Sequence, residues 1–523
     1  MANEMNFGGI GGIGIQGGSD STYNITQIIG ISPEFAHMKT QLHDMEQLLA
    51  LLPEEKEQER NELSARIYKH KELIESFKSD VLKLAESFSR IEINTDRLRR
   101  AKEHFDKGEI TEARVVLEDA LEEMADEKRG LLAKKKEFEE DTVPKLQSKA
   151  DEYLILAQTT ALNYESSTRI ADAKKYFEDS IECAASFKNL FAFAAFLWQH
   201  SEFRRAIEFW QRTLEIAQNS NDKQGEGYCL GNLGNAYQAL GEFQQAIEFH
   251  WQSLEIMRKI GDRFGEGRIL GCLGSECYLL GEYQKAIDFH EQALAIARKI
   301  GDRQGEGNSL ASLGLTYYSL GEYRKAIEYL EQALTIARAT GDRLGETHCL
   351  GNLGAAFRSL GEYQKAIEFH EQRLEIAREI GDRLGEKQGL VNLGNVYYTL
   401  GEFQKAMKSH EQALAIARDI GDRLGEGNSL GNLGLVYDSL GEYRKAIEYH
   451  EQALAISRAI GDRLGEGQCF GNLGLAYDAL GEKEKTCNNW RQALAIFETI
   501  GVPEAKKVRE LMQGAGCGNN GER

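Results

Sequence analysis

Five histidines that recur at forty-residue steps are the first candidates for chemistry in this sequence: His250, His290, His370, His410 and His450. Imidazole is a common metal ligand, but a helical metal site of the His-x-x-x-His kind needs two histidines one turn apart. Each forty-residue step supplies only one. Leu330 and Trp490 occupy the same column. We therefore expect these rings to pack in the core, and we expect no metal site.

A second column carries side-chain amides. We call it the asparagine column, and its members are Asn232, Cys272, Ser312, Asn352, Asn392, Asn432 and Asn472. An amide has both donors and an acceptor, so it can pair with a peptide group whatever the neighbouring side chain is. Two interpretations follow. The amides contact an extended peptide, or each one bonds to the neighbouring repeat and stiffens the stack.

Polar residues that vary from copy to copy lie three and seven residues apart within one helix, and so share a stripe. Arg268, His348 and Arg358 fall in the earlier and middle copies, whereas Asp438 and Asp478 fall late. This order predicts a ligand with an acidic middle and a basic end.

Catalytic motifs are missing from the sequence pattern. We find no nucleophile motif and no convergent pair of acid and base residues. Gly9, Gly11 and Gly14 spell a dinucleotide fingerprint, but no strand precedes it and no helix follows it. We therefore expect no catalytic residues, no enzymatic activity and no cofactor.

The elements that position these columns are seven ungapped copies of one forty-residue unit. The copies open at Asn221, Gly261, Gly301, Gly341, Gly381, Gly421 and Gly461. Each copy contains two apolar stripes with helical spacing. Gly441 is placed to end the first helix of its copy in a left-handed conformation, Gly461 to end the second, and Asp462 to cap the next. A fixed period of this length indicates a stacked array of helix pairs.

The pattern Leu430-x-x-Leu433-Gly434-x-x-Tyr437, followed by Ala446 and Ala453, resembles the tetratricopeptide repeat. The forty-residue unit and its Leu-Gly-Asn tripeptides resemble the Pins/LGN adaptors and, less closely, kinesin light chain. Near-identical copies are associated with bacterial members of this class. The resemblance implies an all-α, right-handed superhelix (an α-solenoid). In such arrays the first helices line the concave groove.

By the same resemblance, the asparagine column is similar to the asparagine ladder in the repeat domain of O-GlcNAc transferase, which holds the backbone of an extended peptide. The groove residues that we expect to bind a peptide are Asn232, Asn235, Arg268, Tyr318, His348, Asn352, Arg358, Asn392, Asn395, Tyr398, Asn432, Asp438, Asn472 and Asp478.

Five regions are expected along the chain. Residues 1–32 form a glycine-rich flexible leader that includes a short strand near Tyr23, and residues 33–93 form a helical hairpin or coiled coil. Residues 94–186 form degenerate repeats with a charged helix. Residues 187–502 form the array, of which 221–500 are regular. Residues 503–523 form a capping helix and a disordered tail.

The apolar stripe of residues 33–93 either seals the hairpin internally, which we favour, or drives self-association. Its members are Leu63, Ile67, His70, Ile74, Phe77, Val81, Leu84 and Phe88. Their steps alternate between four and three, which is a heptad pattern.

Composition excludes several classes of function. The net charge of −20 lacks the basic footprint of a nucleic-acid-binding protein. We see no apolar run long enough to cross a bilayer and no secretory signal. The eight cysteines lack paired metal-type spacing, which predicts free thiols in a cytoplasmic protein.

The combined expectation is a cytoplasmic adaptor that binds a protein or peptide partner, with neither nucleic acid nor a membrane as partner. The alternative is a sensor or regulatory subunit of a bacterial signalling or defence system, which oligomerises or engages an effector through its N-terminal region.

Overall fold

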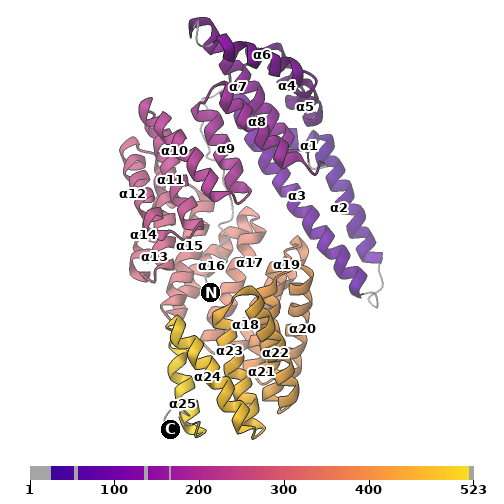
Figure 1. The fold of residues 1–523 in the computed structure, drawn as a ribbon, viewed down its shortest axis with the longest axis vertical. Coiled ribbons are helices and arrows are strands. Elements are labelled where there is room, and N and C mark those ends of the chain that lie inside the picture. Colours follow the sequence, from indigo (N-terminus) through magenta and orange to yellow (C-terminus); the bar gives the residue numbers. More distant parts are fainter. Residues whose placement is uncertain (1–24, 52–56, 135–138, 164–165, 518–523) are drawn as a thin grey trace. The chain divides into compact units, whose positions relative to one another are not determined.

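The computed structural model describes residues 25–51, 57–134, 139–163 and 166–517, and within these ranges every regular element is a helix (Figure 1). The chain divides into two compact units. The first comprises residues 1–52 and 69–320, and the second comprises residues 53–68 and 321–523. The expected leader falls mostly on residues 1–24, and the expected tail includes residues 518–523. Both stretches lie outside the described residues.

Ten helices of the described ranges precede the regular repeats. The first eight are α1 (Ile25–Ile31), α2 (Pro33–Leu51), α3 (Glu57–Arg90), α4 (Asp96–Asp106), α5 (Ile110–Glu118), α6 (Leu121–Lys134), α7 (Glu139–Ala161) and α8 (Arg169–Cys183). The strand expected near Tyr23 is wrong, because Ile25–Ile31 form α1. In the first unit, α4 packs against α5 and α7 packs against α8.

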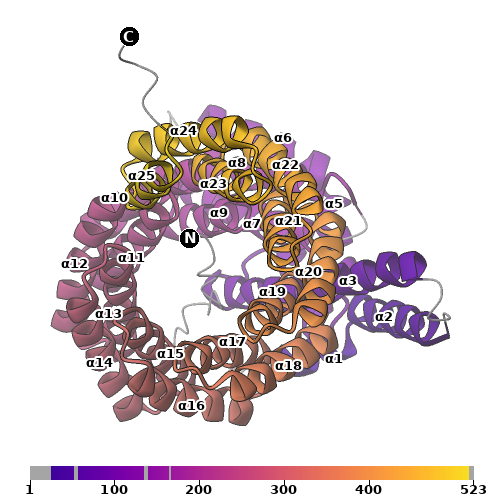
Figure 2. The ribbon, with the colours of Figure 1, turned by 90° about the horizontal axis from the view of Figure 1, so that it is seen from below.

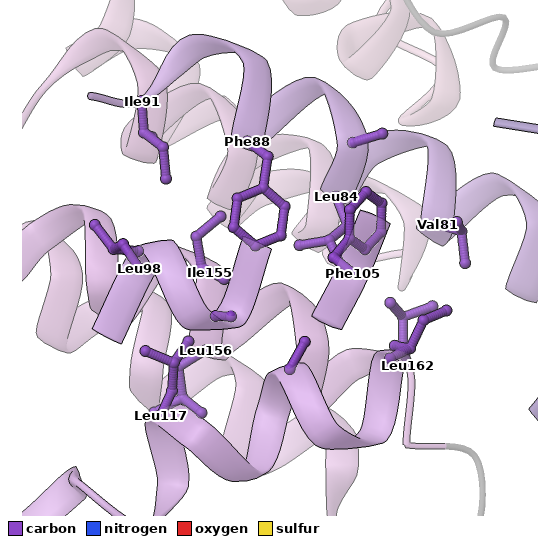
Figure 3. Close-up of a cluster of buried hydrophobic side chains, with 14 of the residues drawn as sticks. Val81, Leu84, Phe88, Ile91, Leu98, Phe105, Leu117, Ile155, Leu156 and Leu162 are labelled. Carbon is purple, nitrogen blue, oxygen red and sulfur yellow. The ribbon is translucent and has the colours of Figure 1, made fainter. Parts of the chain in front are cut away.

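From Ile74 to Phe88, the apolar stripe of α3 is buried inside the first unit. Phe77, Val81 and Leu84 are fully buried, and Phe35 of α2 stacks on Phe77 with ring centroids 6.2 Å apart. His70 is half-buried, and its Nε2 lies 2.8 Å from the carbonyl oxygen of Met38. Beyond Phe77 the stripe packs into a cluster with residues of α4, α5 and α7 (Figure 3). Several helices, rather than one hairpin partner, therefore cover it.

Two further helices, α9 (Phe187–Gln199) and α10 (Phe203–Asn219), lead into the regular repeats. The first helices of the seven copies are α11 (Lys223–Ala239), α13 (Arg263–Leu279), α15 (Arg303–Ser319), α17 (Arg343–Ser359), α19 (Arg383–Thr399), α21 (Arg423–Ser439) and α23 (Arg463–Ala479). The second helices are α12 (Phe243–Ile260), α14 (Tyr283–Ile300), α16 (Tyr323–Thr340), α18 (Tyr363–Ile380), α20 (Phe403–Asp419), α22 (Tyr443–Ile460) and α24 (Lys483–Ile500).

Aspartate and glycine set the helix boundaries as the sequence predicts. The Asp462 side chain accepts a hydrogen bond of 2.9 Å from the backbone N–H of Gly465, which caps α23. Gly441 and Gly461 have φ values of 76° and 73°, in the left-handed region that glycine adopts without steric cost.

Within a repeat, the two helices meet where a glycine of the first helix faces the histidine column of the second. All five histidines are 2% exposed or less, so the prediction of core packing is confirmed. At Gly394, an added Cβ would lie 2.5 Å from Cε1 of His410. A larger residue at this point of contact would force the His410 ring or one of the two helices to move.

Between repeats, a buried glutamate joins two arginines. Glu266 Oε1 accepts from Arg258 Nε at 2.9 Å, and its Oε2 accepts from Arg263 Nη1 at 2.6 Å. Arg258 belongs to the preceding repeat, so the carboxylate ties two copies together. The same arrangement recurs at Glu306, Glu346, Glu386, Glu426 and Glu466. The sequence analysis did not assign this role to the glutamates.

The C-terminal helix α25 (Glu504–Gly514) packs against α24. A disulfide joins Cys487 of α24 to Cys517, with the two Cα atoms 5.4 Å apart. The expectation of eight free thiols is therefore wrong for this pair, because the turn into α25 brings together two cysteines that are 30 residues apart in sequence. The six remaining cysteines are free.

The contact between Gly394 and His410 predicts that adding one methyl group at this position lowers the free energy of unfolding. Gly394→Ala should lower the free energy of unfolding by about 1–3 kcal/mol, because overpacking forces His410 or a helix to move. The measurement is urea denaturation followed by circular dichroism. Gly431→Ala is the matched control. It lies in α21, an added Cβ would meet nothing within 4 Å, and Ala311 already occupies the equivalent position. A loss of the same size in both variants would contradict the prediction.

The buried histidines also predict a pH dependence of stability. Burial lowers the pKa of His410 from 6.5 to about 4. Between these values the unfolded chain binds a proton that the native chain does not, so stability is complete above pH 6.5 and falls as the pH drops toward 4. The variant His410→Leu carries the residue that Leu330 provides at the equivalent position of another copy. Its urea midpoint should fall less between pH 7 and pH 5 than that of the wild type. An identical decline in both proteins would exclude this contribution.

Candidate peptide-binding face

The first helices of the repeats lie on the inner side of a curved row, and the second helices lie on its outer side. This holds in each unit taken by itself (Figure 2). In the first unit the inner helices include α11, α13 and α15, and in the second they are α17, α19, α21 and α23. All the sequence-predicted site residues belong to these inner helices.

The side chains of the asparagine column share the same degree of burial in every copy. Each of its seven side chains is half-buried, which places it between the core and solvent. Across the described ranges, the amides of Asn232, Asn352, Asn392, Asn432 and Asn472 make no hydrogen bond to other protein groups. The stiffening interpretation requires such bonds, and the contacts described for these five residues do not provide them.

In the first unit, the other candidates have different surroundings. Arg268 is exposed, and its guanidinium lies 6.0 Å from the centroid of the Phe264 ring. Tyr318 is half-buried on α15. Asn235 is occupied within the protein, since its Oδ1 lies 3.2 Å from Nε2 of His250 and 3.5 Å from Sγ of Cys272. The Asn235 amide thus has partners within the protein, unlike the five amides of the asparagine column.

In the second unit, His348 is exposed, and Asn395, Arg358 and Tyr398 are half-buried. The Tyr398 hydroxyl accepts a hydrogen bond of 2.9 Å from Ser439 Oγ of the next repeat, so it links α19 to α21. Binding a ligand there would involve both repeats.

The two late aspartates differ from each other. Asp478 is exposed on α23. Asp438 is half-buried, and its Oδ2 lies 3.0 Å from Nε2 of the core residue His450. Asp438 is thus partly engaged in packing its own repeat, and Asp478 is the more accessible acid.

The sequence analysis missed Arg373, which reaches this region from a second helix, α18. Its Nη2 donates to Oε1 of Gln388 at 2.5 Å, and Nη1 lies beside Gly351, where an added Cβ would be 2.6 Å away. The side chain is only 7% exposed. Ala occupies this column at positions 293, 333, 413, 453 and 493, so the change to arginine was visible when the copies were aligned.

The described residues hold no group of three or more His, Cys, Asp or Glu side chains that could bind a metal ion. None of the helices in the described ranges is long and apolar enough to cross a bilayer.

Paired helices stacked through a forty-residue repeat define a protein of the α-solenoid class. The family model "Tetratricopeptide repeat" matches residues 189–259, 266–339, 327–379, 386–459 and 440–499. These ranges make up more than half of the sequence, and the chain belongs to the tetratricopeptide repeat family. Comparison with the curated proteins gives no match.

Several solved structures match the chain at low identity. One is a STAND (signal transduction ATPase with numerous domains) protein with a tetratricopeptide repeat sensor from Pyrococcus horikoshii. It is 16% identical with a TM-score of 0.53, and the match covers 86% of this chain and 69% of that one. Aspartyl phosphate phosphatase F from Bacillus subtilis is 16% identical, with a TM-score of 0.46 and coverages of 71% and 95%. The quorum sensor NprR from B. thuringiensis is 16% identical, with a TM-score of 0.39 and coverages of 60% and 99%.

Proposed function

We propose that this chain is a non-enzymatic scaffold that binds an extended segment of a partner protein along the first-helix faces of its repeats. Membership of the tetratricopeptide repeat family supports a role in protein interaction or regulation. The observation that carries the proposal is the asparagine column. Five half-buried amides recur once per repeat without a hydrogen-bond partner among the described protein groups.

Recognition of backbone is the chemistry that suits such a column. A peptide group offers one donor and one acceptor, and an asparagine amide can satisfy both. Amides spaced once per repeat would follow a long segment irrespective of its side chains. This mode resembles the asparagine ladder in the repeat domain of O-GlcNAc transferase, which holds the backbone of an extended peptide.

Sequence preference would then come from the variable stripe. In the second unit, Arg358 and His348 lie on α17, whereas Asp478 lies on α23. A partner segment with acidic residues against α17 and basic residues toward α23 would complement these charges. Arg373 adds positive charge close to α17, where its guanidinium lies beside Gly351.

The N-terminal region favours this scaffold over the sensor alternative that self-associates through residues 33–93. Self-association through the stripe of α3 requires exposed apolar residues, but Ile74, Phe77, Val81, Leu84 and Phe88 are buried. Because these side chains are already buried within one chain, a dimer that formed through them would bury little additional apolar surface.

The proposed role of the asparagine column predicts a loss of partner binding when its amides are removed. Replacing Asn352, Asn392 and Asn432 together with Ala should abolish capture of the partner from a lysate of the native host, read by mass spectrometry. Gln372→Ala, Gln412→Ala and Gln452→Ala together form the matched control, because they remove three exposed amides from the outer helices. Circular dichroism should show both triple variants folded. A partner that both variants capture equally would place the binding site elsewhere.

The oligomeric state distinguishes the scaffold from the self-associating sensor. Light scattering after gel filtration should give the mass of one chain, about 59 kDa, because the α3 stripe is already covered. A dimer that persists on dilution, and that is lost on deleting residues 33–93, would favour the sensor.

A further inference from the structure

A hydrogen-bonded chain of four side chains joins the first and second regular repeats, both in the first unit. Glu276 of α13 accepts from His250 Nδ1 of α12 at 2.7 Å. His250 Nε2 lies 3.2 Å from Asn235 Oδ1 of α11, and that same oxygen accepts from Cys272 Sγ at 3.5 Å. Glu276 and Cys272 lie one turn apart on α13, so the chain begins and ends on one helix.

The partners of His250 indicate that its ring carries both protons. Nδ1 faces a carboxylate oxygen, and Nε2 lies 3.2 Å from the carbonyl oxygen of Gly231. Both oxygens can only accept hydrogen bonds, so each ring nitrogen must donate. His250 and Glu276 are both fully buried, and they form an imidazolium–carboxylate ion pair.

The electrostatic environment supports the protonated ring. Burial by itself lowers the pKa of His250, but the neighbouring Cys272 and Glu276 outweigh burial and raise it to about 10. Arg268 lies one turn before Cys272 on α13 and is the other charged residue on this side of the helix.

The other repeats show that packing alone does not require this ion pair. In the column of Glu276 the other copies have Ala, Thr or Val, and the column of Cys272 is mainly Asn. Burial lowers the pKa of His290 to about 4, and its Nδ1 has no hydrogen-bond partner in the described structure. The cysteine, the glutamate and the protonated histidine therefore occur together at one junction, between the first and second regular copies, of an otherwise repeated design.

Cys272 also differs from the other free cysteines in its exposure. Of the six free cysteines in the described ranges, five are buried and Cys272 is half-buried. One oxygen of Glu276, Oε2, is buried without a hydrogen-bond partner in the described structure, so this acid is not fully satisfied by its role in packing. Among the described free cysteines, Cys272 is thus the one that solvent can reach, and it lies one turn from an acid with an unsatisfied oxygen.

We propose that Cys272 is a reactive thiol on the first-helix face, positioned by Asn235 and by the His250–Glu276 ion pair, and that hydroperoxides oxidise it to sulfenic acid. The sulfur attacks one peroxide oxygen, an S–O bond forms and the O–O bond breaks. Sulfur loses two electrons and the peroxide gains them. The departing oxygen takes up the thiol proton and leaves as water or an alcohol. Cationic neighbours favour this chemistry because the thiolate is the nucleophile.

The experiment measures the reactivity of each cysteine in the full chain. Native protein at pH 7 is treated with iodoacetamide, or with hydrogen peroxide followed by dimedone, and peptides are quantified by mass spectrometry. Cys272 should be labelled first by both routes, and faster than the same cysteine in the urea-unfolded chain. His250→Leu and Glu276→Val should each slow it about tenfold, the order expected for one lost hydrogen bond to a charged group.

The repeats themselves supply the controls. Leu330 is the natural counterpart of His250→Leu, and Val396 is that of Glu276→Val, so both variants should fold, as circular dichroism can verify. Above about pH 9, where a thiol ionises without help, the variant rates should approach the wild-type rate. A deficit that persists at high pH would indicate a merely structural role. That outcome would overturn the proposal. Equal labelling rates of Cys272 in the variants and the wild type at pH 7 would also overturn it, as would a labelling rate in the native protein no faster than in the unfolded chain.

Discussion

The close approach of two helices at a single glycine is the constraint on which each repeat depends. Gly394 leaves room for the ring of His410, and the same pairing recurs in five further copies: a histidine faces Gly234, Gly274, Gly354 and Gly434, and Trp490 faces Gly474. Because the large residue fills the space of the missing side chain, the angle between the helices has little freedom. The inner face that carries the asparagine column therefore inherits its geometry from a contact in the core.

Charge links the repeats in a different way. At each regular junction a buried carboxylate such as Glu266 bridges an arginine of its own helix and an arginine of the preceding copy. Removing one partner would leave a buried charge unpaired. This loss costs more free energy than the intact pair contributes to stability. Packing thus fixes the geometry within a repeat, and ion pairs specify how neighbouring repeats join.

Much of this fold could be predicted because its signals are local. Period, helix caps and the burial of the histidines follow from residues within one unit, as at Gly441 and Asp462. Features that depend on distant contacts could not be predicted. The Cys487–Cys517 disulfide needs α25 to fold back on α24. Likewise, the position of Arg373 depends on the space beside Gly351. Which candidate site residues contact a partner is a question about chemistry outside this chain.

The uniform junctions bear on how such a protein changes over generations. Each repeat presents nearly the same surface to the copy before it and to the copy after it. Deleting or duplicating one whole unit by recombination within the gene would therefore join two surfaces that already match. Array length can vary in steps of forty residues with no new interface to be invented, and each added unit would lengthen the row of amides by one.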